Sequence, residues 1–336
     1  MMNHSLKNQC KISPGTEIVG KWHSNKYILI KELGYGANGV VYLAKHQNTQ
    51  VALKMSDNGM SITAEVNVLK SFAKVQGSTL GPSLLDVDDW LTKSGQISFY
   101  VMEYIQGPDL LTFLHQKGNS WTTVLFLQLL NDLDNLHENG WVFGDLKPEN
   151  LIVTGPAPRI RCIDVGGTTI QGRGIKEFTE FFDRGYWGLG TRKAEPSYDL
   201  FAVAMIMINT AYPKRFNKSN GGISQLREAI RLRQELKPLE KVILKSLHGS
   251  YLSARHMRAD LLETMVDKRS PEPVLKSATS SSNTSKQNTI PASKVSGHYT
   301  RQNYRKKKKR KGWKETLFIA VIMFLLYSFI SYITLK

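Results

Sequence analysis

The chain has 336 residues and a formal net charge of +17, a length that allows one domain with a large core together with additional segments. The positive charge is uneven, because residues 268–312 contain 13 Lys or Arg and one Glu, which leaves residues 1–267 only mildly basic. Cys10 and Cys162 are the only cysteines, so a disulfide-stabilised secreted scaffold is excluded and a reducing cytosol is the expected compartment. Residues 1–20 lack the apolar run of a signal peptide, so none is expected.

A glycine-rich stretch follows the first predicted strand. Residues 27–33 alternate in polarity and run into Gly34, Gly36 and Gly39, in the pattern G-x-G-x-x-G-x-V, and a second strand is predicted over residues 40–44. In a dinucleotide-binding domain such glycines open a helix, whereas the β-branched and aromatic residues on both sides here favour a hairpin that covers phosphates. On its own, the motif fits a plain glycine hairpin equally well.

A lysine in a strand and a glutamate in a helix come next. The following predicted strand reads V-A-L-K and ends in Lys54, which would ordinarily be a solvated edge residue. Residues 61–73 carry apolar side chains at helical spacing and predict a helix. Glu65 in this helix is the only glutamate between residues 55 and 102. It is therefore the candidate carboxylate that positions Lys54.

The pattern of apolar residues then predicts two more strands and a series of helices. The strands cover residues 84–87 and 97–102. The helices cover residues 110–115, 121–138, 199–208, 226–232, 239–247 and 254–265. A β-rich part therefore precedes a longer α-rich part. No internal repeat and no Cys/His spacing typical of a metal site is present in the sequence.

The stretch W-V-F-G-D-L-K-P-E-N-L-I-V, which begins at residue 141, places three polar side chains in one short loop. The Asp145 carboxylate can accept the proton of an attacking hydroxyl, and the Lys147 cation can offset charge on a γ-phosphate. The Asn150 amide oxygen can hold Mg²⁺. A surface turn with scattered polar residues is the alternative when this stretch is taken alone. Fourteen residues after Asn150, Asp164 ends an apolar strand in the sequence I-D-V-G.

Together these motifs resemble the Hanks-type (eukaryotic-like) Ser/Thr protein kinases over residues 21–266. The loop is similar to H-R-D-L-K-x-x-N, with Phe143 and Gly144 in place of His and Arg, and I-D-V-G is similar to D-F-G, with Val165 in place of Phe. The apolar stretch led by Asp199 resembles the central helix whose Asp supports the catalytic loop. The resemblance implies the bilobal protein-kinase fold of the α+β class, with a β-rich small lobe and an α-rich large lobe.

The resemblance also implies the chemistry of the site. ATP and Mg²⁺ are the expected ligands, and protein Ser/Thr hydroxyls are the expected acceptors. Asp145 would orient the acceptor hydroxyl and take its proton, and Lys147 would stabilise the transferred phosphoryl group. Asn150 and Asp164 would hold Mg²⁺. The Ser/Thr preference, as opposed to Tyr, rests on the Lys147 pattern.

The nucleotide-binding residues follow from the same resemblance. Lys54, positioned by Glu65, would grip the α- and β-phosphates. The segment M-E-Y-I-Q-G resembles the hinge between the lobes, so backbone groups near Glu103 and Tyr104 would face adenine. The remaining expected contacts come from the glycine hairpin and from apolar residues on either side of the ring: Gly34, Gly36, Gly39, Val41, Ala52 and Ile152.

The sequence departs from the family pattern in two places. Gly144 stands where many kinases have the Arg that grips a phosphorylated activation loop, so phosphorylation is not expected to act through that contact. Residues 185–190 align with G-Y-x-A-P-E, and residues 250–254 align with the later segment whose Arg pairs with that Glu. Both partners are absent, which leaves no unpaired buried charge. The resemblance places the activation segment at residues 166–190, with Thr168, Thr169 and Thr179 as its possible phosphorylation sites.

The C-terminal region changes character. Residues 268–312 are rich in Ser, Thr, Asn, Lys and Pro and predict a disordered basic linker. Residues 316–335 carry no charge in twenty positions, about the length that crosses a ~30 Å hydrocarbon core. Residues 313–336 therefore predict a transmembrane anchor rather than a buried core helix. The predicted division places an N-terminal extension at residues 1–20 and the protein kinase domain at residues 21–267.

Charge predicts the location and partners of the chain. Basic residues lie on the N-terminal side of the apolar span, so that side, with the kinase domain, is expected to be cytoplasmic in a single-pass bacterial cell-membrane protein. The basic run from Arg305 to Lys311 exceeds what a topology signal needs. DNA or anionic lipid is therefore a candidate partner, and gathering molecules on a polyanion would promote self-association and autophosphorylation in trans.

The arrangement of a kinase domain and one terminal anchor resembles most the C-terminally membrane-anchored sporulation kinases of spore-forming bacilli. Two other functions are considered: a membrane-tethered pseudokinase scaffold, and a nucleic-acid-binding protein in which the kinase fold is secondary. The complete set of Lys54, Asp145, Asn150 and Asp164 argues against the first. The basic linker supports nucleic-acid binding but does not argue against catalysis.

Overall fold

The structure is a computed structural model that describes residues 10–36, 39–74, 80–93, 95–118, 120–212, 214–219 and 221–267. No helix in these ranges is long and apolar enough to cross a membrane. The apolar stretch at residues 316–335 and the basic linker lie outside the described residues. The transmembrane anchor and the linker therefore stay predictions.

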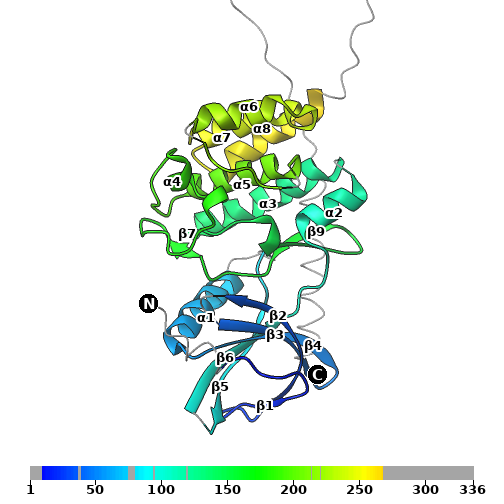
Figure 1. The fold of residues 1–336 in the computed structure, drawn as a ribbon, viewed down its shortest axis with the longest axis vertical. Helices are drawn as coiled ribbons and strands as arrows, with labels where there is room; N and C mark the ends of the chain where they lie inside the picture. Colours follow the sequence, from blue (N-terminus) through cyan, green and yellow to red (C-terminus); the bar gives the residue numbers. More distant parts are fainter. Residues whose placement is uncertain are drawn as a thin grey trace, which may run out of the picture. The chain divides into compact units, whose positions relative to one another are not determined.

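A six-stranded antiparallel sheet and one helix form the small lobe (Figure 1), and the strand order is β1-β2-β3-β4-β6-β5. The strands are β1 (Glu17–Val19), β2 (Lys26–Gly36), β3 (Gly39–His46), β4 (Thr49–Ser56), β5 (Leu84–Thr92) and β6 (Gly95–Glu103). Helix α1 (Gly59–Lys74) contacts β4, β5 and β6. Each predicted strand of this lobe is confirmed, as is the predicted helix.

The segment expected to be an N-terminal extension contributes to this lobe. Strand β1 pairs with β2, and the side chain of Ile18 is fully buried. The Tyr42 hydroxyl donates to the Cys10 carbonyl oxygen at 2.8 Å and accepts from the Ile12 amide at 2.8 Å. Cys10 itself is buried. Residues 10–20 thus close one face of the small-lobe core.

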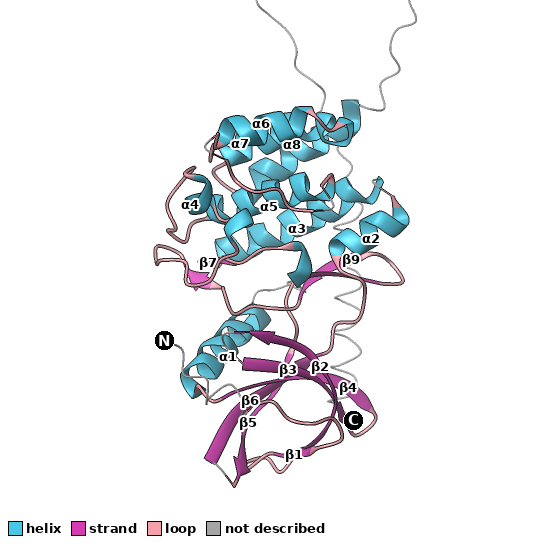
Figure 2. Ribbon diagram, in the orientation of Figure 1, coloured by secondary structure: helices cyan, strands magenta, loops and turns pink. Residues whose placement is uncertain are grey.

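Helices dominate the large lobe (Figure 2). The α-helices are α2 (Leu110–Lys117), α3 (Ser120–Glu138), α4 (Arg184–Trp187), α5 (Pro196–Thr210), α6 (Ile223–Arg231), α7 (Glu240–Leu247) and α8 (Ala254–Asp267). Short strands and 3₁₀ turns lie between them: β7 (Trp141–Val142), η2 (Pro148–Asn150), β8 (Leu151–Thr154), β9 (Arg159–Cys162), β10 (Thr169–Ile170), η3 (Glu180–Phe182) and η4 (Gln234–Leu239).

Helix α5 is the centre of the large lobe. Every residue from Tyr198 to Asn209 is buried, as expected for a helix that is apolar on all sides. The helix begins at Pro196, three residues earlier than predicted. Pro fits the first turn of a helix, because its missing N–H would have no partner within the helix there. The predicted β-rich small lobe and α-rich large lobe are confirmed, and the polar Asp199 is left buried in an apolar environment.

Candidate active site

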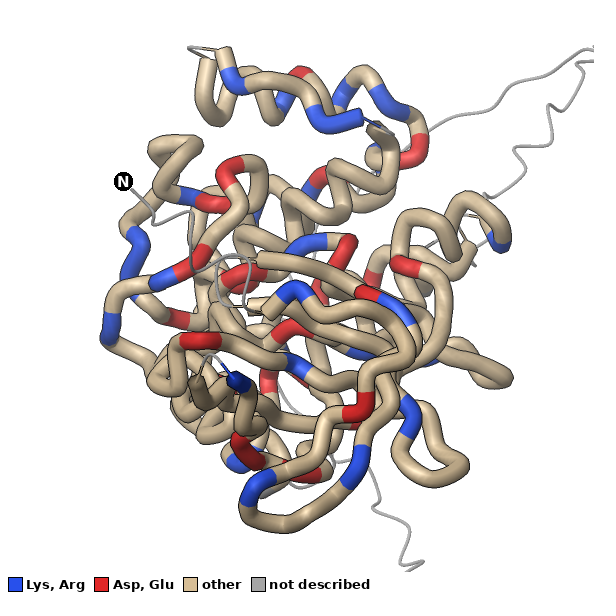
Figure 3. The backbone as a smooth tube through the Cα atoms, turned by 60° about the horizontal axis from the view of Figure 1, so that its bottom comes forward, with Lys and Arg blue, Asp and Glu red and all other residues tan. Residues whose placement is uncertain are grey.

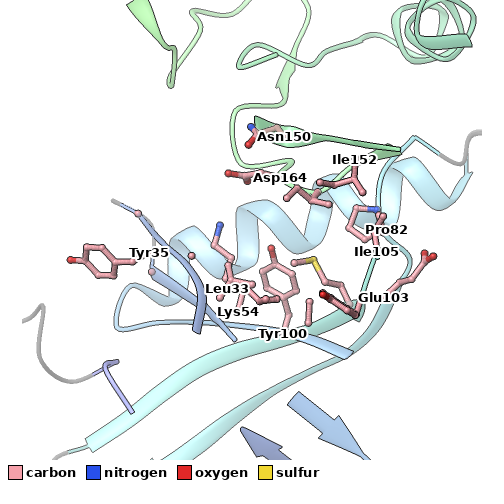
Figure 4. Close-up of a pocket in the computed structure, with 18 of the residues that line it drawn as sticks. Leu33, Tyr35, Lys54, Pro82, Tyr100, Glu103, Ile105, Asn150, Ile152 and Asp164 are labelled. Atoms are coloured by element: carbon pink, nitrogen blue, oxygen red, sulfur yellow. The ribbon is translucent and has the colours of Figure 1, made fainter. Parts of the chain in front are cut away.

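A cavity of about 440 Å³ lies between the two lobes (Figure 4). Its walls come from the β2–β3 hairpin, β4, the end of β6 with the segment after it, strand β8 with the turn before it, and the loop after β9. Nine of the ten predicted nucleotide-binding residues line it: Gly34, Gly36, Gly39, Val41, Ala52, Lys54, Glu103, Tyr104 and Ile152. The predicted metal ligands Asn150 and Asp164 line the same cavity. The tenth nucleotide-binding residue, Glu65, is buried and hydrogen-bonded to Lys54.

The glycine-rich hairpin closes over one side of the cavity. Gly36 pairs with Gly39 at the end of the β2–β3 ladder, and Gly39 has φ +128°. A Cβ at Gly39 would lie 2.2 Å from the Met55 carbonyl oxygen, so only glycine fits. A Cβ at Gly34 or Gly36 would meet nothing within 4 Å. The backbone at these two positions can therefore be approached closely by a ligand.

A buried ion pair joins β4 to α1. The Lys54 Nζ atom lies 2.6 Å from Glu65 Oε2, and the Tyr100 hydroxyl donates to the same oxygen at 2.8 Å. Burial raises the pKa of Glu65, and the nearby Lys54 charge only partly offsets this effect. The second oxygen, Oε1, is buried and has no hydrogen-bond partner among the described residues. A Cβ built on Gly166 would lie 3.6 Å from Oε1 and 3.3 Å from Asp164 Oδ1.

The loop between β7 and β8 holds Asp145 by both carboxylate oxygens. Lys147 Nζ donates to Oδ2 at 2.5 Å, and the Thr179 hydroxyl donates to Oδ1 at 3.0 Å. The Asn150 amide nitrogen lies 3.4 Å from the Asp145 carbonyl oxygen. Figure 4 shows Asn150 and Asp164 beside each other on the side of the cavity that faces Lys54.

Helix α5 holds the backbone of this loop through Asp199. Its two carboxylate oxygens accept from the Phe143 amide at 2.7 Å and from the Gly144 amide at 2.9 Å. His137 Nε2, at the end of α3, lies 2.8 Å from Asp199 Oδ2. Sequence reasoning missed His137, although its place in the last turn before the loop was the available signal. The three buried partners fix the loop that carries Asp145.

The backbone conformation explains why glycine occupies position 144, which the motif comparison did not reveal. Its φ is +86°, and a Cβ there would lie 2.6 Å from the Gly167 carbonyl oxygen. The loop and the start of the activation segment therefore approach too closely for the family's Arg in this conformation. Phe143, Val165 and Leu69 are all buried in the core that spans both lobes.

The activation segment is folded against the large lobe. Thr168 and Thr169 are buried, and Thr179 is hydrogen-bonded to Asp145, so none of these three possible phosphorylation sites is a freely exposed hydroxyl. Asp183 caps α4 by accepting from the Gly185 and Tyr186 amides at 3.0 and 2.9 Å. Residues 185–190, which lack the family's Glu, are held by this cap rather than by an ion pair of their own.

Two ion pairs fix the end of the segment. Arg184 donates to Glu195 at 2.6 Å, and Arg192 lies 2.6 Å from the fully buried Asp183. Tyr251, in the segment that replaces the family's late Arg, donates to Asp260 at 2.9 Å. Charged contacts inside the segment thus stabilise the loop without the family's Glu–Arg pair.

Comparison with known proteins agrees with this geometry. Residues 27–273 match the protein kinase domain family, and the chain therefore belongs to that family. It is a Hanks-type protein serine/threonine kinase.

Individual relatives support the assignment. The chain is 58% identical over 266 residues to the serine/threonine-protein kinase YabT of Bacillus subtilis (strain 168). This match covers 78% of this chain and 79% of YabT. It is 31% identical over 157 residues to the serine/threonine-protein kinase ppk31 of Schizosaccharomyces pombe, and 31% identical over 151 residues to the human serine/threonine-protein kinase ULK1. These two matches cover 42% and 43% of this chain but only 14% of each relative.

Proposed function

We propose that the chain transfers the γ-phosphoryl group of ATP to Ser/Thr hydroxyls of proteins, with Asp145 as the group that takes the hydroxyl proton. The observation that carries the proposal is the convergence on one cleft of the Lys54–Glu65 pair, the Asn150/Asp164 pair and the loop that holds Asp145. A cation, two oxygen ligands and a fixed carboxylate are the parts that phosphoryl transfer requires.

The cavity fits an adenine nucleotide. Val41, Ala52 and Ile152 provide apolar walls for a flat ring. The Glu103 carboxylate is turned toward Arg161, whose two terminal nitrogens each lie 2.9 Å from a Glu103 oxygen. The Glu103 carboxylate is therefore occupied away from a base, which leaves the backbone of this segment for the expected hinge contact.

The same cavity fits Mg²⁺. Asn150 offers an amide oxygen and Asp164 a carboxylate, the kinds of ligand that Mg²⁺ prefers. When bound, the metal offsets phosphate charge. Lys54 is held in the cavity by Glu65 and is free to donate from its remaining N–H groups to phosphate oxygens.

Asp145 and Lys147 act together on the acceptor. The Lys147 ammonium lies 2.5 Å from one Asp145 oxygen, so the acceptor hydroxyl that donates to Asp145 also lies near a cation. That cation stabilises negative charge on the transferred group. Thr179 fixes the other oxygen and so limits rotation of the carboxylate.

Transfer is tested with the full-length chain in detergent micelles. Single-turnover transfer from γ-labelled ATP to the chain itself and to a protein acceptor is compared between wild type and Lys54→Ala. The expected loss is several orders of magnitude with an unchanged thermal unfolding temperature, whereas Lys45→Ala, on the exposed face of the neighbouring strand, keeps the activity. Undiminished transfer by Lys54→Ala contradicts the proposal. Phosphoamino-acid analysis tests the Ser/Thr preference.

We further propose that residues 313–336 anchor the chain in a bacterial cell membrane, with the kinase domain at residues 21–267 in the cytoplasm. Support comes from twenty uncharged positions after a strongly basic flank. Protease added to intact, wall-stripped cells is expected to spare the kinase domain. Its digestion under these conditions reverses the proposed topology.

The basic run from Arg305 to Lys311 supports a role beyond topology. Seven successive cations, each contributing roughly 1 kcal/mol near an anionic leaflet, suffice to bind acidic lipid, and DNA offers the same charge chemistry. Such a polyanion would gather kinase molecules and promote autophosphorylation in trans. A chain ending before residue 313 is assayed with DNA or anionic vesicles across a salt series. If replacing the run by Ser/Gly changes neither binding nor activity, the run is only a topology signal.

A further inference from the structure

Residues 172–176 in the activation segment and residues 192–194 just after it run side by side and carry exposed cations. The Gly172 amide donates to Ala194 at 2.8 Å, and the Ile175 amide donates to Arg192 at 2.8 Å. The Ala194 amide donates back to Arg173 at 2.7 Å. The exposed basic residues on these stretches, here called the basic ribbon, are Arg173, Lys176, Arg192 and Lys193.

The basic ribbon is attached directly to the catalytic loop. Ile175 is buried with Val142 in a small apolar cluster, and its Cδ1 atom would lie 3.4 Å from a Cβ at Gly144. On the other stretch, the Arg192 guanidinium lies 4.0 Å from the centre of the Phe178 ring. Phe178 directly precedes Thr179, which donates to Asp145. The backbone that carries the cations is therefore packed against the loop of Asp145.

Most cations of the basic ribbon form no ion pair with a described residue, although the hydrogen bond from Arg184 and the nearby charge of Lys193 both lower the pKa of the Glu195 carboxyl. Arg192 is paired with the buried Asp183, but Arg173, Lys176 and Lys193 make no ion pair with any described residue. Figure 3 shows Lys and Arg at several positions along the loops at its left edge, with Asp and Glu at others.

The acidic residues nearest in sequence to the basic ribbon are few and mostly engaged elsewhere. Glu177 lines the nucleotide cavity, and its Oε2 atom would lie 3.6 Å from a Cβ on Gly166. Glu195 is paired with Arg184. Glu180 is exposed and is the one remaining acid that could offset the basic ribbon. The surface beside Asp145 therefore presents positive charge that a negatively charged ligand can neutralise.

We propose that the basic ribbon selects substrates in which Asp or Glu residues flank the acceptor Ser or Thr. The inference rests on the proposed phosphoryl transfer and adds a substrate class to it. Exposed charge pairs are individually weak, but three cations carried on a hydrogen-bonded backbone and acting together on one peptide are expected to change kcat/KM roughly 10-fold. The effect lies in KM, because these side chains bind the peptide flanks and do not reach the reacting atoms.

The test uses the full-length chain in detergent and three peptides of equal length, with Asp/Glu, Gln or Lys/Arg around one Ser. The ribbon variant combines Arg173→Glu, Lys176→Glu and Lys193→Glu. A matched control combines Arg227→Glu, Lys237→Glu and Lys241→Glu, three exposed residues elsewhere on the large lobe. The readouts are KM and kcat for each peptide.

Wild type and the control are expected to favour the acidic peptide roughly 10-fold through KM, and the ribbon variant is expected to lose or invert this ratio. If the ribbon variant fails to fold, the salt dependence of KM in the wild type tests the proposal instead. Added salt is expected to raise KM for the acidic peptide and to leave KM for the neutral peptide unchanged. If an active wild type uses all three peptides equally, this inference alone is overturned. The same holds if the control loses its preference for the acidic peptide as fully as the ribbon variant does. Absence of transfer to any acceptor overturns the proposed function as well.

Discussion

Asp145 is the residue that we propose takes the proton of the acceptor hydroxyl. Both of its oxygens are held, one by the Lys147 ammonium and one by the Thr179 hydroxyl. The contact from Thr179 reaches across 34 positions of sequence. In the sequence, Thr179 was noted only as a possible phosphorylation site, because nothing local links it to Asp145.

Replacing Thr179 by Val keeps the shape of the side chain and removes its hydroxyl. A hydrogen bond to a charged group contributes about 1.5–3 kcal/mol, so kcat is expected to fall roughly 10- to 100-fold. Thr179→Ser keeps the hydroxyl and is expected to retain most of the activity. KM for ATP should not change, because Thr179 does not line the nucleotide cavity. Equal kcat values for the Val and Ser variants would show that the hydroxyl is not needed.

For single residues, the sequence predicted the side chains that belong to a motif. It did not predict the side chains that hold those motif residues in place. Lys54 and Glu65 lie 11 positions apart and could be paired by elimination. His137 and Tyr100 were not found, because each acts through a partner that only the folded chain brings near. Gly144 was read as a lost Arg, whereas the backbone at that point requires glycine.

The catalytic loop depends on a backbone conformation that few residues adopt. Gly144→Ala places a methyl group 2.6 Å from the Gly167 carbonyl oxygen at a φ of +86°. The free energy of unfolding is expected to fall by about 2–4 kcal/mol, from strain and overlap together. Gly140→Ala is the matched control, because it has φ +81° and no atom within 4 Å. It should cost only about 1 kcal/mol. Denaturant titration of both variants measures the difference, and equal losses would contradict the close approach.

The activation segment is anchored at Asp183, which is fully buried. Burial opposes its ionisation, but hydrogen bonds from Arg192, Tyr198 and the backbone outweigh that effect and hold the pKa of Asp183 below its usual range. The ionised group therefore stabilises the folded state above a pH of about 4, the pKa of an unfolded Asp. This stabilisation is lost as the pH falls through the lower pKa of the folded state.

Asp183→Asn is expected to lower the free energy of unfolding at pH 7 by about 2–4 kcal/mol, because the buried carboxylate accepts hydrogen bonds from Tyr198, Arg192 and two backbone amides, and a neutral amide accepts fewer and weaker ones. The difference between wild type and variant should shrink as the pH falls below about 4, where wild type also loses the charge. Denaturant titration at several pH values between neutral and acid measures this. A difference that stays constant over the whole range would show that the carboxylate charge does not contribute.

Most elements were predictable because their apolar residues repeat at the period of a strand or helix. Helix α3 and the apolar α5 were found within a few residues of their ends, as was the pair β3–β4. Strand β1 has only three residues, too short to show a period, and was placed in an extension. The four-residue α4 was missed for the same reason, since its stability comes from the cap that Asp183 provides.

At the scale of the whole molecule, the bilobal fold could be predicted because ordered motifs specify it, whereas the contacts between distant loops could not. The basic ribbon brings together residues 173–176 and 192–193 through backbone hydrogen bonds, and no sequence motif connects these two stretches. The fold thus joins a predicted reaction centre to the proposed substrate surface. At that centre, we propose that Asp145 takes the proton of the acceptor hydroxyl.

That claim is tested most directly by single-turnover γ-phosphoryl transfer with Asp145→Asn in the full-length chain, measured beside wild type and with ATP binding followed separately. Asn keeps the size of the side chain and cannot take a proton. The account predicts that transfer falls by several orders of magnitude, at least the 10²- to 10⁴-fold typical of a lost general base, while ATP binding and the unfolding temperature stay the same. Transfer at the wild-type rate by the Asp145→Asn chain would contradict the account.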